Sequence, residues 1–134
     1  MDTMARTRPN VRRKLRITLT AGPTAAAAAR SQVRAAIYAW DVPVDSSVAV
    51  LLTSELVTNA LRHEAGKTIE LVISCAYGQL HVDVYDTSPV LPMPVDGPAN
   101  AETGRGLMLL ASLSSSWGYY RTPTGKAVYF TLIY

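Results

Sequence analysis

The sequence is poor in cysteine and has no long apolar run, and each shortage excludes a class of protein. Cys75 is the only cysteine, so an internal disulfide and a multi-cysteine zinc site are excluded, and we expect a cytoplasmic setting. No stretch approaches the ~20 apolar residues of a membrane helix. After the basic residues 12–16, Thr18, Gly22 and Pro23 interrupt the apolar core that a signal peptide would need. We therefore expect neither a membrane span nor export.

Positive charge is concentrated near residue 1. The formal net charge is +3; six basic residues and Asp2 give residues 1–16 a charge of +5, which leaves −2 for residues 17–134. A basic stripe on a folded face would indicate nucleic-acid binding, whereas an aperiodic basic leader is typical of a solvated tail. We expect residues 1–10 to form a disordered basic arm and residues 11–134 to form one domain, which is large enough for a hydrophobic core.

Alternating apolar residues predict strands in three regions. Leu15, Ile17 and Leu19 share one side of a first strand. Residues 66–86 resemble two strands joined at 77–79, and the last twenty-one residues resemble two more that turn at 123–125.

Helical patterns fill most of the remaining chain. The first predicted helix is rich in alanine, a strong helix former, and the second can be capped by Asp45 or Ser46. A loop with four prolines over residues 87–103 precedes the third. The predicted helices span residues 24–40, 46–63 and 107–113. This order of elements predicts an α+β fold, a two-layer α/β sandwich with helices packed on one face of a mostly antiparallel, mixed sheet.

The second helix carries polar residues on a side where apolar residues are expected. Glu55, Asn59 and His63 recur every four residues in the sector that also holds Leu52 and Leu56. A half-buried carboxylate needs a partner, and Mg²⁺ would suit these oxygens because it prefers a few protein oxygens together with waters and phosphates. Asn59 is the candidate metal ligand, and Glu55 the candidate general base.

A structural role for the same residues is the alternative. Glu55 would then pair with Arg62 or another base, and Asn59 would bond to a neighbouring loop. For His63 we favour a surface or supporting role over metal ligation.

Two further features are typical of a nucleotide site. Asp86 ends the row formed by Leu80, Val82 and Val84, so it is expected to face inward. There it can accept a hydrogen bond from an adenine amino group or cap the turn that follows.

In the stretch TGRGL, Gly104 and Gly106 are placed at the start of the third helix. Glycines allow close approach of phosphates, and a helix start offers free amide hydrogens; an ordinary flexible turn is the alternative.

Taken in order, these stretches resemble the ATP-binding boxes of a known superfamily. ELVTNALRH is similar to the N box, VYDTSP to a reduced first glycine box, ETGRGLMLL to the second, and GKAVYF to the last box of the gyrase, histidine-kinase and mismatch-repair ATPases with the Bergerat fold. The chain from residue 11 onward most resembles the small bacterial anti-sigma-factor serine kinases.

The resemblance implies roles for individual residues. Asn59 would bind Mg²⁺, Glu55 would act as the base and Asp86 would hold the adenine amino group. The nucleotide, ATP or ADP, would also contact the segment Gly104, Arg105, Gly106 and Leu107. An exposed surface position is the alternative for Arg105.

Two departures from the family pattern affect the adenine end of this site. No glycine follows Asp86 in Thr87-Ser88-Pro89-Val90, and Ala127 stands where the last box often carries a hydroxyl. The first departure alters the expected path of the loop, and the second removes an expected contact near the adenine.

The expected function is that of an ATP- and Mg²⁺-binding regulator of the anti-sigma type. By the resemblance it would phosphorylate a serine of an anti-anti-sigma protein, sequester a sigma factor, or do both, and a homodimer would fit. A non-catalytic module whose partner affinity depends on nucleotide is the alternative, and binding of nucleic acid through the basic arm and the aromatic hairpin is a third hypothesis that we do not favour.

Overall fold

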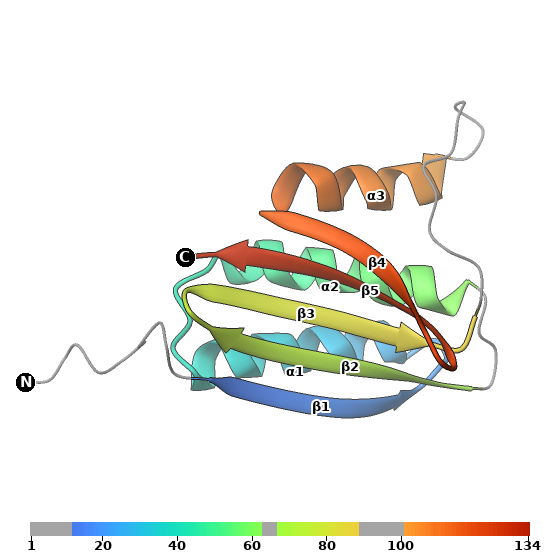
Figure 1. The fold of residues 1–134 in the computed structure, drawn as a ribbon, viewed down its shortest axis with the longest axis horizontal. Helices are drawn as coiled ribbons and strands as arrows, with labels where there is room; N and C mark the ends of the chain where they lie inside the picture. The colour runs from blue at the N-terminus through green and yellow to red at the C-terminus, as the bar shows by residue number, and fades with distance from the viewer. Residues whose placement is uncertain (1–11, 63–66, 89–100) are drawn as a thin grey trace, which may run out of the picture.

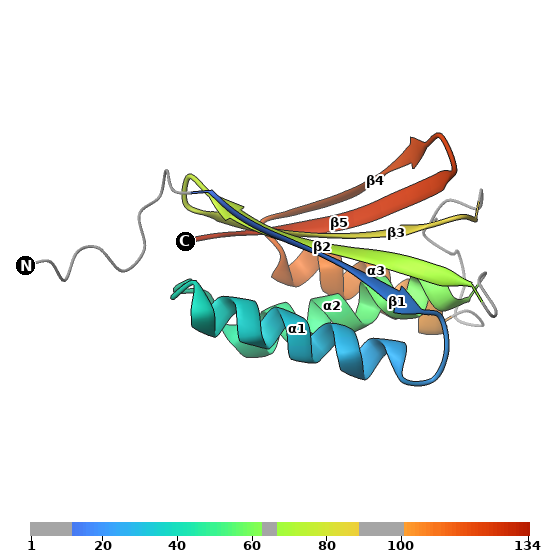
Figure 2. The same ribbon diagram turned by 90° about the horizontal axis from the view of Figure 1, so that it is seen from below.

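The computed structural model describes residues 12–62, 67–88 and 101–134, with side chains in the last range from residue 106 onward. In this part of the chain, five strands form one sheet and three helices lie together on one of its faces, while the other face carries no helix (Figure 1 and Figure 2). The predicted two-layer α+β fold is thus confirmed. The elements are β1 (Arg13–Thr20), α1 (Ala25–Ala39), α2 (Ser46–Leu61), β2 (Thr68–Ala76), β3 (Gln79–Asp86), α3 (Ala101–Leu113), β4 (Ser116–Thr122) and β5 (Gly125–Ile133).

The sheet has the strand order β1-β2-β3-β5-β4, so β5 lies inside the sheet and β4 at its edge. All four pairings between the described strands are antiparallel, without the parallel pair that a mixed sheet would contain. Tyr77 and Gly78 close the turn between β2 and β3 with φ values of 54° and 76°. Two positive φ values in a two-residue loop match the right-handed twist of the strands, which explains the predicted hairpin.

The core lies between the sheet and helices α1 and α2. Leu52 and Leu56 of α2 are buried there with Val82 and Val84 of β3. Asp45 caps α2 by accepting hydrogen bonds from the backbone N–H groups of Ser47 and Val48. The burial of one side of α2 fixes its rotation and thereby the direction in which its polar residues point.

The bare face of the sheet is covered by its own polar and aromatic side chains. The Tyr85 and Tyr120 hydroxyls are hydrogen-bonded at 2.8 Å, and the His81 ring stacks on Tyr129 with centroids 4.9 Å apart. His81 Nε2 also lies 3.2 Å from the Asp83 carboxylate, which is buried. The aromatic residues of the second hairpin therefore include packing partners for the sheet, the role that strand propensity favours.

Helix α3 differs from its prediction. It begins at Ala101 and not near Leu107, so Gly104 and Gly106 lie within the helix rather than at its N-terminus. Each glycine in a helix interior costs about 1 kcal/mol relative to alanine, and the sequence pattern therefore indicated a break. Packing of α3 beside α2 offsets this cost, because Gly106 lies where the two helices approach each other.

Several predictions fall outside the described residues. These are the basic arm over residues 1–10, His63 at the end of the second helix, and most of the loop over residues 87–103. Within the described ranges, none of the helices combines the length and apolar character needed to cross a membrane.

Candidate functional site

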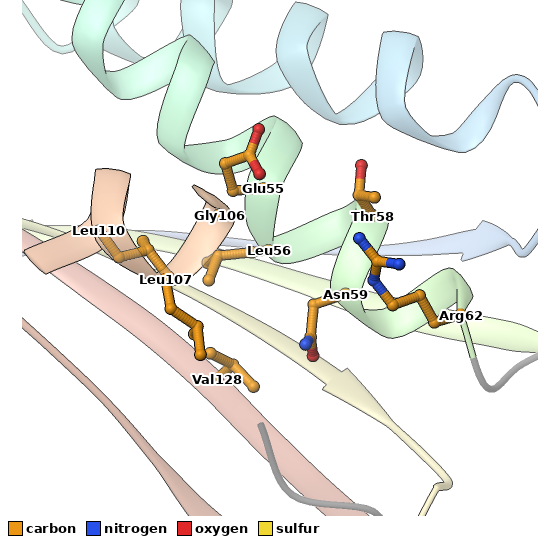
Figure 3. A pocket seen from close by; sticks show the side chains of 9 residues that line it. All are labelled: Glu55, Leu56, Thr58, Asn59, Arg62, Gly106, Leu107, Leu110 and Val128. Carbon is orange, nitrogen blue, oxygen red and sulfur yellow. The ribbon is translucent and has the colours of Figure 1, made fainter. Parts of the chain in front are cut away.

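A small cleft lies between α2 and α3 on the helix-covered side of the sheet. Its volume is about 20 Å³, which is room for one water molecule. Figure 3 shows its polar side chains on α2 and its apolar wall on α3 and β5. The lining residues are Glu55, Leu56, Thr58, Asn59, Arg62, Gly106, Leu107, Leu110 and Val128.

Asn59 carries a buried oxygen that no protein group satisfies. Its side-chain Oδ1 has no hydrogen-bond partner, and Figure 3 shows the amide pointing from α2 toward the sheet. An unpaired buried carbonyl oxygen is expensive, since it loses its hydration without replacement. The predicted alternative, a hydrogen bond from Asn59 to a neighbouring loop, is thus not made through this oxygen, which can accept an external donor or a hard cation.

Glu55 lies in the same cleft one turn earlier. It is half-buried, and its Oε1 lies 2.7 Å from the position that a Cβ on Gly106 would occupy. Among the described residues no ion pair joins Glu55 to Arg62, so this structural alternative is not observed. Figure 3 shows the Glu55 carboxylate and the Asn59 amide pointing in different directions; a substrate between them would require the carboxylate to turn.

Asp86 does not belong to the lining of this cleft. As predicted, its side chain belongs to the inward face of β3, but it lines a separate cavity of about 200 Å³ with Thr18, Thr68 and Thr124. Its carboxylate accepts hydrogen bonds from Lys126 Nζ at 2.8 and 3.0 Å, and from the Ser88 backbone N–H at 2.9 Å. The hydrogen bond from Ser88 is the turn cap that we considered as an alternative. In the part of the chain that the structure describes, Asp86 thus lines a different cavity from the cleft that holds Glu55 and Asn59.

The predicted phosphate-binding segment lies on α3. Gly106 and Leu107 line the cleft, and both are buried. Gly104 and Arg105 belong to the same helix, but their side-chain environment lies outside the described residues. Gly104 and Gly106 do not form a helix start here. The free amide hydrogens of α3 belong to its first turn, which begins at Ala101.

Lys126 is the residue that the sequence reasoning missed. The sequence predicts no separate role for it within the stretch GKAVYF, yet it is fully buried opposite Asp86. The available signal was alternation: Lys126, Val128 and Phe130 occupy one side of a strand, and a lysine at an inward position needs an acidic partner. Ala127, by contrast, pairs with Tyr85, whose row faces away from the helices. A hydroxyl at position 127 would therefore not lie on the helix-covered side of the sheet.

The residues present fit a hard cation. Asn59 contributes one unpaired oxygen and Glu55 lies one turn away, which is the kind of donor set on which Mg²⁺ relies when waters and phosphates complete its coordination. The described residues contain no group of three or more histidine, cysteine, aspartate or glutamate side chains that could hold a metal by themselves. The cleft can therefore assist a cation that arrives with its own oxygen ligands.

The fold and this cleft define a small two-layer α+β domain with a cleft between two helices beneath an antiparallel sheet. The chain belongs to the histidine kinase-like ATPase domain family, whose model matches residues 19–132. Membership implies binding of ATP. A comparison with curated proteins finds no match.

A similar fold occurs in the crystal structure of the RsbU and RsbW domains of Rv1364c from Mycobacterium tuberculosis. The TM-score is 0.68 at 22% sequence identity, and the match covers 90% of this chain and 32% of that one. The chain thus spans about a third of that longer protein, and at this identity the similarity shows the fold alone.

Proposed function

We propose that this protein is an ATP- and Mg²⁺-dependent regulator of the anti-sigma type that transfers the terminal phosphate of ATP to a serine of a partner protein. The observation that carries the proposal is the unpaired Oδ1 of Asn59 in a cleft shared with Glu55. Family membership and a similar structure that contains an RsbW domain support it. An anti-anti-sigma protein is the proposed substrate, a sigma factor the proposed sequestered partner, and a homodimer the proposed assembly.

The proposed chemistry assigns one task to each side chain. Asn59 Oδ1 would hold Mg²⁺, which when bound neutralises phosphate charge. Glu55 would orient the serine hydroxyl and accept its proton as the serine oxygen bonds to the γ-phosphorus and the bond from that phosphorus to the leaving oxygen of ADP breaks. Leu107, Leu110 and Val128 form the apolar wall that limits water beside the reacting groups.

As the described residues form it, the cleft is too small to hold a whole nucleotide. A volume of about 20 Å³ is far below the several hundred Å³ of sites for ligands of that size. Gly106 of α3 lies against Glu55 of α2, so a shift of α3 away from α2 would enlarge the cleft and also free the carboxylate. We propose that nucleotide binding and movement of α3 are coupled.

A non-catalytic, nucleotide-dependent binding module is the second candidate. The different directions of the Glu55 and Asn59 side chains favour it (Figure 3). In that case α3 would move on nucleotide binding and change the affinity for a partner, without phosphate transfer.

Calorimetry with ATP and Mg²⁺ tests the site itself. Asn59→Ala is expected to weaken Mg²⁺-dependent binding by about tenfold or more, as expected for loss of a ligand to a divalent ion. Leu51→Ala, at an exposed position of α2 outside the cleft, is the matched control. Equal affinities of wild type and Asn59→Ala would reject the proposed site.

Transfer of labelled phosphate from ATP to a candidate partner separates the two functions. Glu55→Gln is expected to lower the transfer rate by about a hundredfold and to leave ATP affinity nearly unchanged. Glu70→Gln, which removes the half-buried carboxylate paired with Arg16 outside the cleft, is the control. ATP binding without transfer to any anti-anti-sigma protein would favour the non-catalytic module.

A further inference from the structure

The ion pair between Asp86 and Lys126 is the most deeply buried charged contact among the described residues. The Lys126 side chain is 0% exposed and that of Asp86 is 1% exposed. The two residues are direct partners in the pairing of β3 with β5, so the backbone register holds them opposite each other. Lys126 Nζ donates to both carboxylate oxygens, at 3.0 Å to Oδ1 and 2.8 Å to Oδ2.

The surroundings of the pair fix its geometry from the side of β3. The Ser88 N–H donates a hydrogen bond to Asp86 Oδ1 at 2.9 Å. The backbone of Gly125 packs closely against that of Asp86, because a Cβ on Gly125 would lie 2.0 Å from the Asp86 carbonyl oxygen. Oδ1 thus accepts two hydrogen bonds and Oδ2 accepts one. A carboxylate offers about four lone-pair sites, so little acceptor capacity is left.

This arrangement conflicts with a simple role of Asp86 as the reader of an adenine amino group. An amino group that approaches Asp86 meets a carboxylate already neutralised and covered by Lys126. To form the same hydrogen bond, the base has to displace the ammonium group or share the carboxylate with it.

We propose that Lys126 is a specificity-determining residue of the nucleotide site, because its ammonium competes with the amino group of adenine for Asp86. The proposal rests on the function proposed above. Adenine presents an amino donor where guanine presents a carbonyl acceptor. Asp86 alone would accept a hydrogen bond from the amino group of adenine and repel the carbonyl oxygen of guanine. The pair of Asp86 and Lys126 offers an acceptor and a donor together, so the pair discriminates weakly between the two bases.

Affinities for ATP and GTP, measured in the presence of Mg²⁺, test this competition. In the wild type we expect the two dissociation constants to agree within about threefold, and in Lys126→Met we expect ATP to bind at least about tenfold more tightly than GTP. Methionine keeps an unbranched apolar stem without the ammonium group. Lys67→Met, which replaces an exposed lysine, is the matched control and is expected to keep the wild-type ratio.

A measurement on the wild-type chain covers the case in which Lys126→Met fails to fold. With ¹³C-labelled lysine, the side-chain NMR signal of Lys126, assigned with Lys126→Arg, is expected to shift on saturation with ATP. Inorganic triphosphate, which has no base, is expected to leave that signal in place.

The outcomes separate this proposal from the proposed function. If ATP binds and Asn59→Ala weakens it, but folded Lys126→Met keeps the wild-type ratio or the Lys126 signal does not move, the function stands and the role of Lys126 is refuted. If neither chain binds any nucleotide, both proposals are refuted.

Discussion

Oε1 of Glu55 lies 2.7 Å from the point that a Cβ atom on Gly106 would occupy. This distance is shorter than real Cβ contacts, so helices α2 and α3 can keep their present spacing, with the carboxylate in its present place, only with glycine at position 106. The sequence indicated Gly106 as a phosphate-binding residue, and the structure adds that it sets the place of the candidate base.

The substitution Gly106→Ala is expected to displace the Glu55 carboxylate without unfolding the protein. The contacted atom is the end of a flexible side chain, and alanine is better than glycine in a helix interior, so the free energy of unfolding should stay equal or rise by up to about 1 kcal/mol. Phosphate transfer should fall about tenfold. Denaturant unfolding and the transfer assay measure the two effects; a loss of stability with unchanged transfer would contradict this view.

By contrast, Gly125→Ala is expected to destabilise the fold strongly. A Cβ at this position would lie 2.0 Å from the Asp86 carbonyl oxygen and 2.6 Å from Thr87 Cα. These are backbone atoms, and relief of the clash would disturb the pairing of β3 with β5, so we expect a loss of about 3 kcal/mol.

Thermal and denaturant unfolding measure this effect. Gly22→Ala is the control, because a Cβ there would meet no atom within 4 Å, and it should change the free energy of unfolding by less than about 0.5 kcal/mol. Equal effects of the two substitutions would show that close approach does not explain the glycine at 125.

Removal of the N-cap of α2 should cost a moderate amount of stability. Asp45 Oδ1 accepts hydrogen bonds from the N–H groups of Ser47 and Val48, whereas Thr24 at the start of α1 makes no side-chain cap bond. Asp45→Ala is expected to lower the free energy of unfolding by about 1 kcal/mol. Denaturant titration of Asp45→Ala beside Thr24→Ala checks this, and the second variant should lose clearly less.

Alkaline pH should reveal the surroundings of the Tyr120 phenol, a side chain that is 42% exposed. Partial burial raises the pKa of this phenol, with further contributions from its hydrogen bond to Tyr85 and from the nearby Asp83. The folded protein therefore favours the neutral phenol: its contribution to stability is fully present below about pH 10, the ordinary tyrosine pKa, and is lost as the pH rises through the higher folded value.

An ultraviolet titration of tyrosinate formation checks this sign. Tyr120→Phe should remove a group that titrates later than free tyrosine and should weaken the alkaline loss of stability. Tyr38→Phe, which removes a phenol that is 89% exposed, is the control variant. Titration of Tyr120 together with free tyrosine would refute the predicted shift.

Much of the fold could be predicted because alternation and helical periodicity are local properties. The row Leu80, Val82, Val84 placed Asp86 on the inward face of its strand, and the structure places it there. Its partner could not be predicted in the same way. Lys126 lies 40 residues away, and the pair depends on the register between two strands that the sequence does not state.

The start of α3 escaped prediction for a related reason. Gly104 and Gly106 lower the local preference for helix, but contact with α2 decides the outcome. Asn59 was identified from periodicity, whereas its unpaired oxygen is a property of everything packed around it and can be recognised only in three dimensions.

The place of β5 between β3 and β4 also affects how the protein is made. Of the five strands, β5 leaves the ribosome last, yet it fills the gap inside the sheet and brings Lys126 to Asp86. Until then the acidic group has no counter-ion and the edge of β3 stays open, a state prone to wrong association. Completion of the sheet, and of the buried ion pair, therefore depends on the arrival of β5.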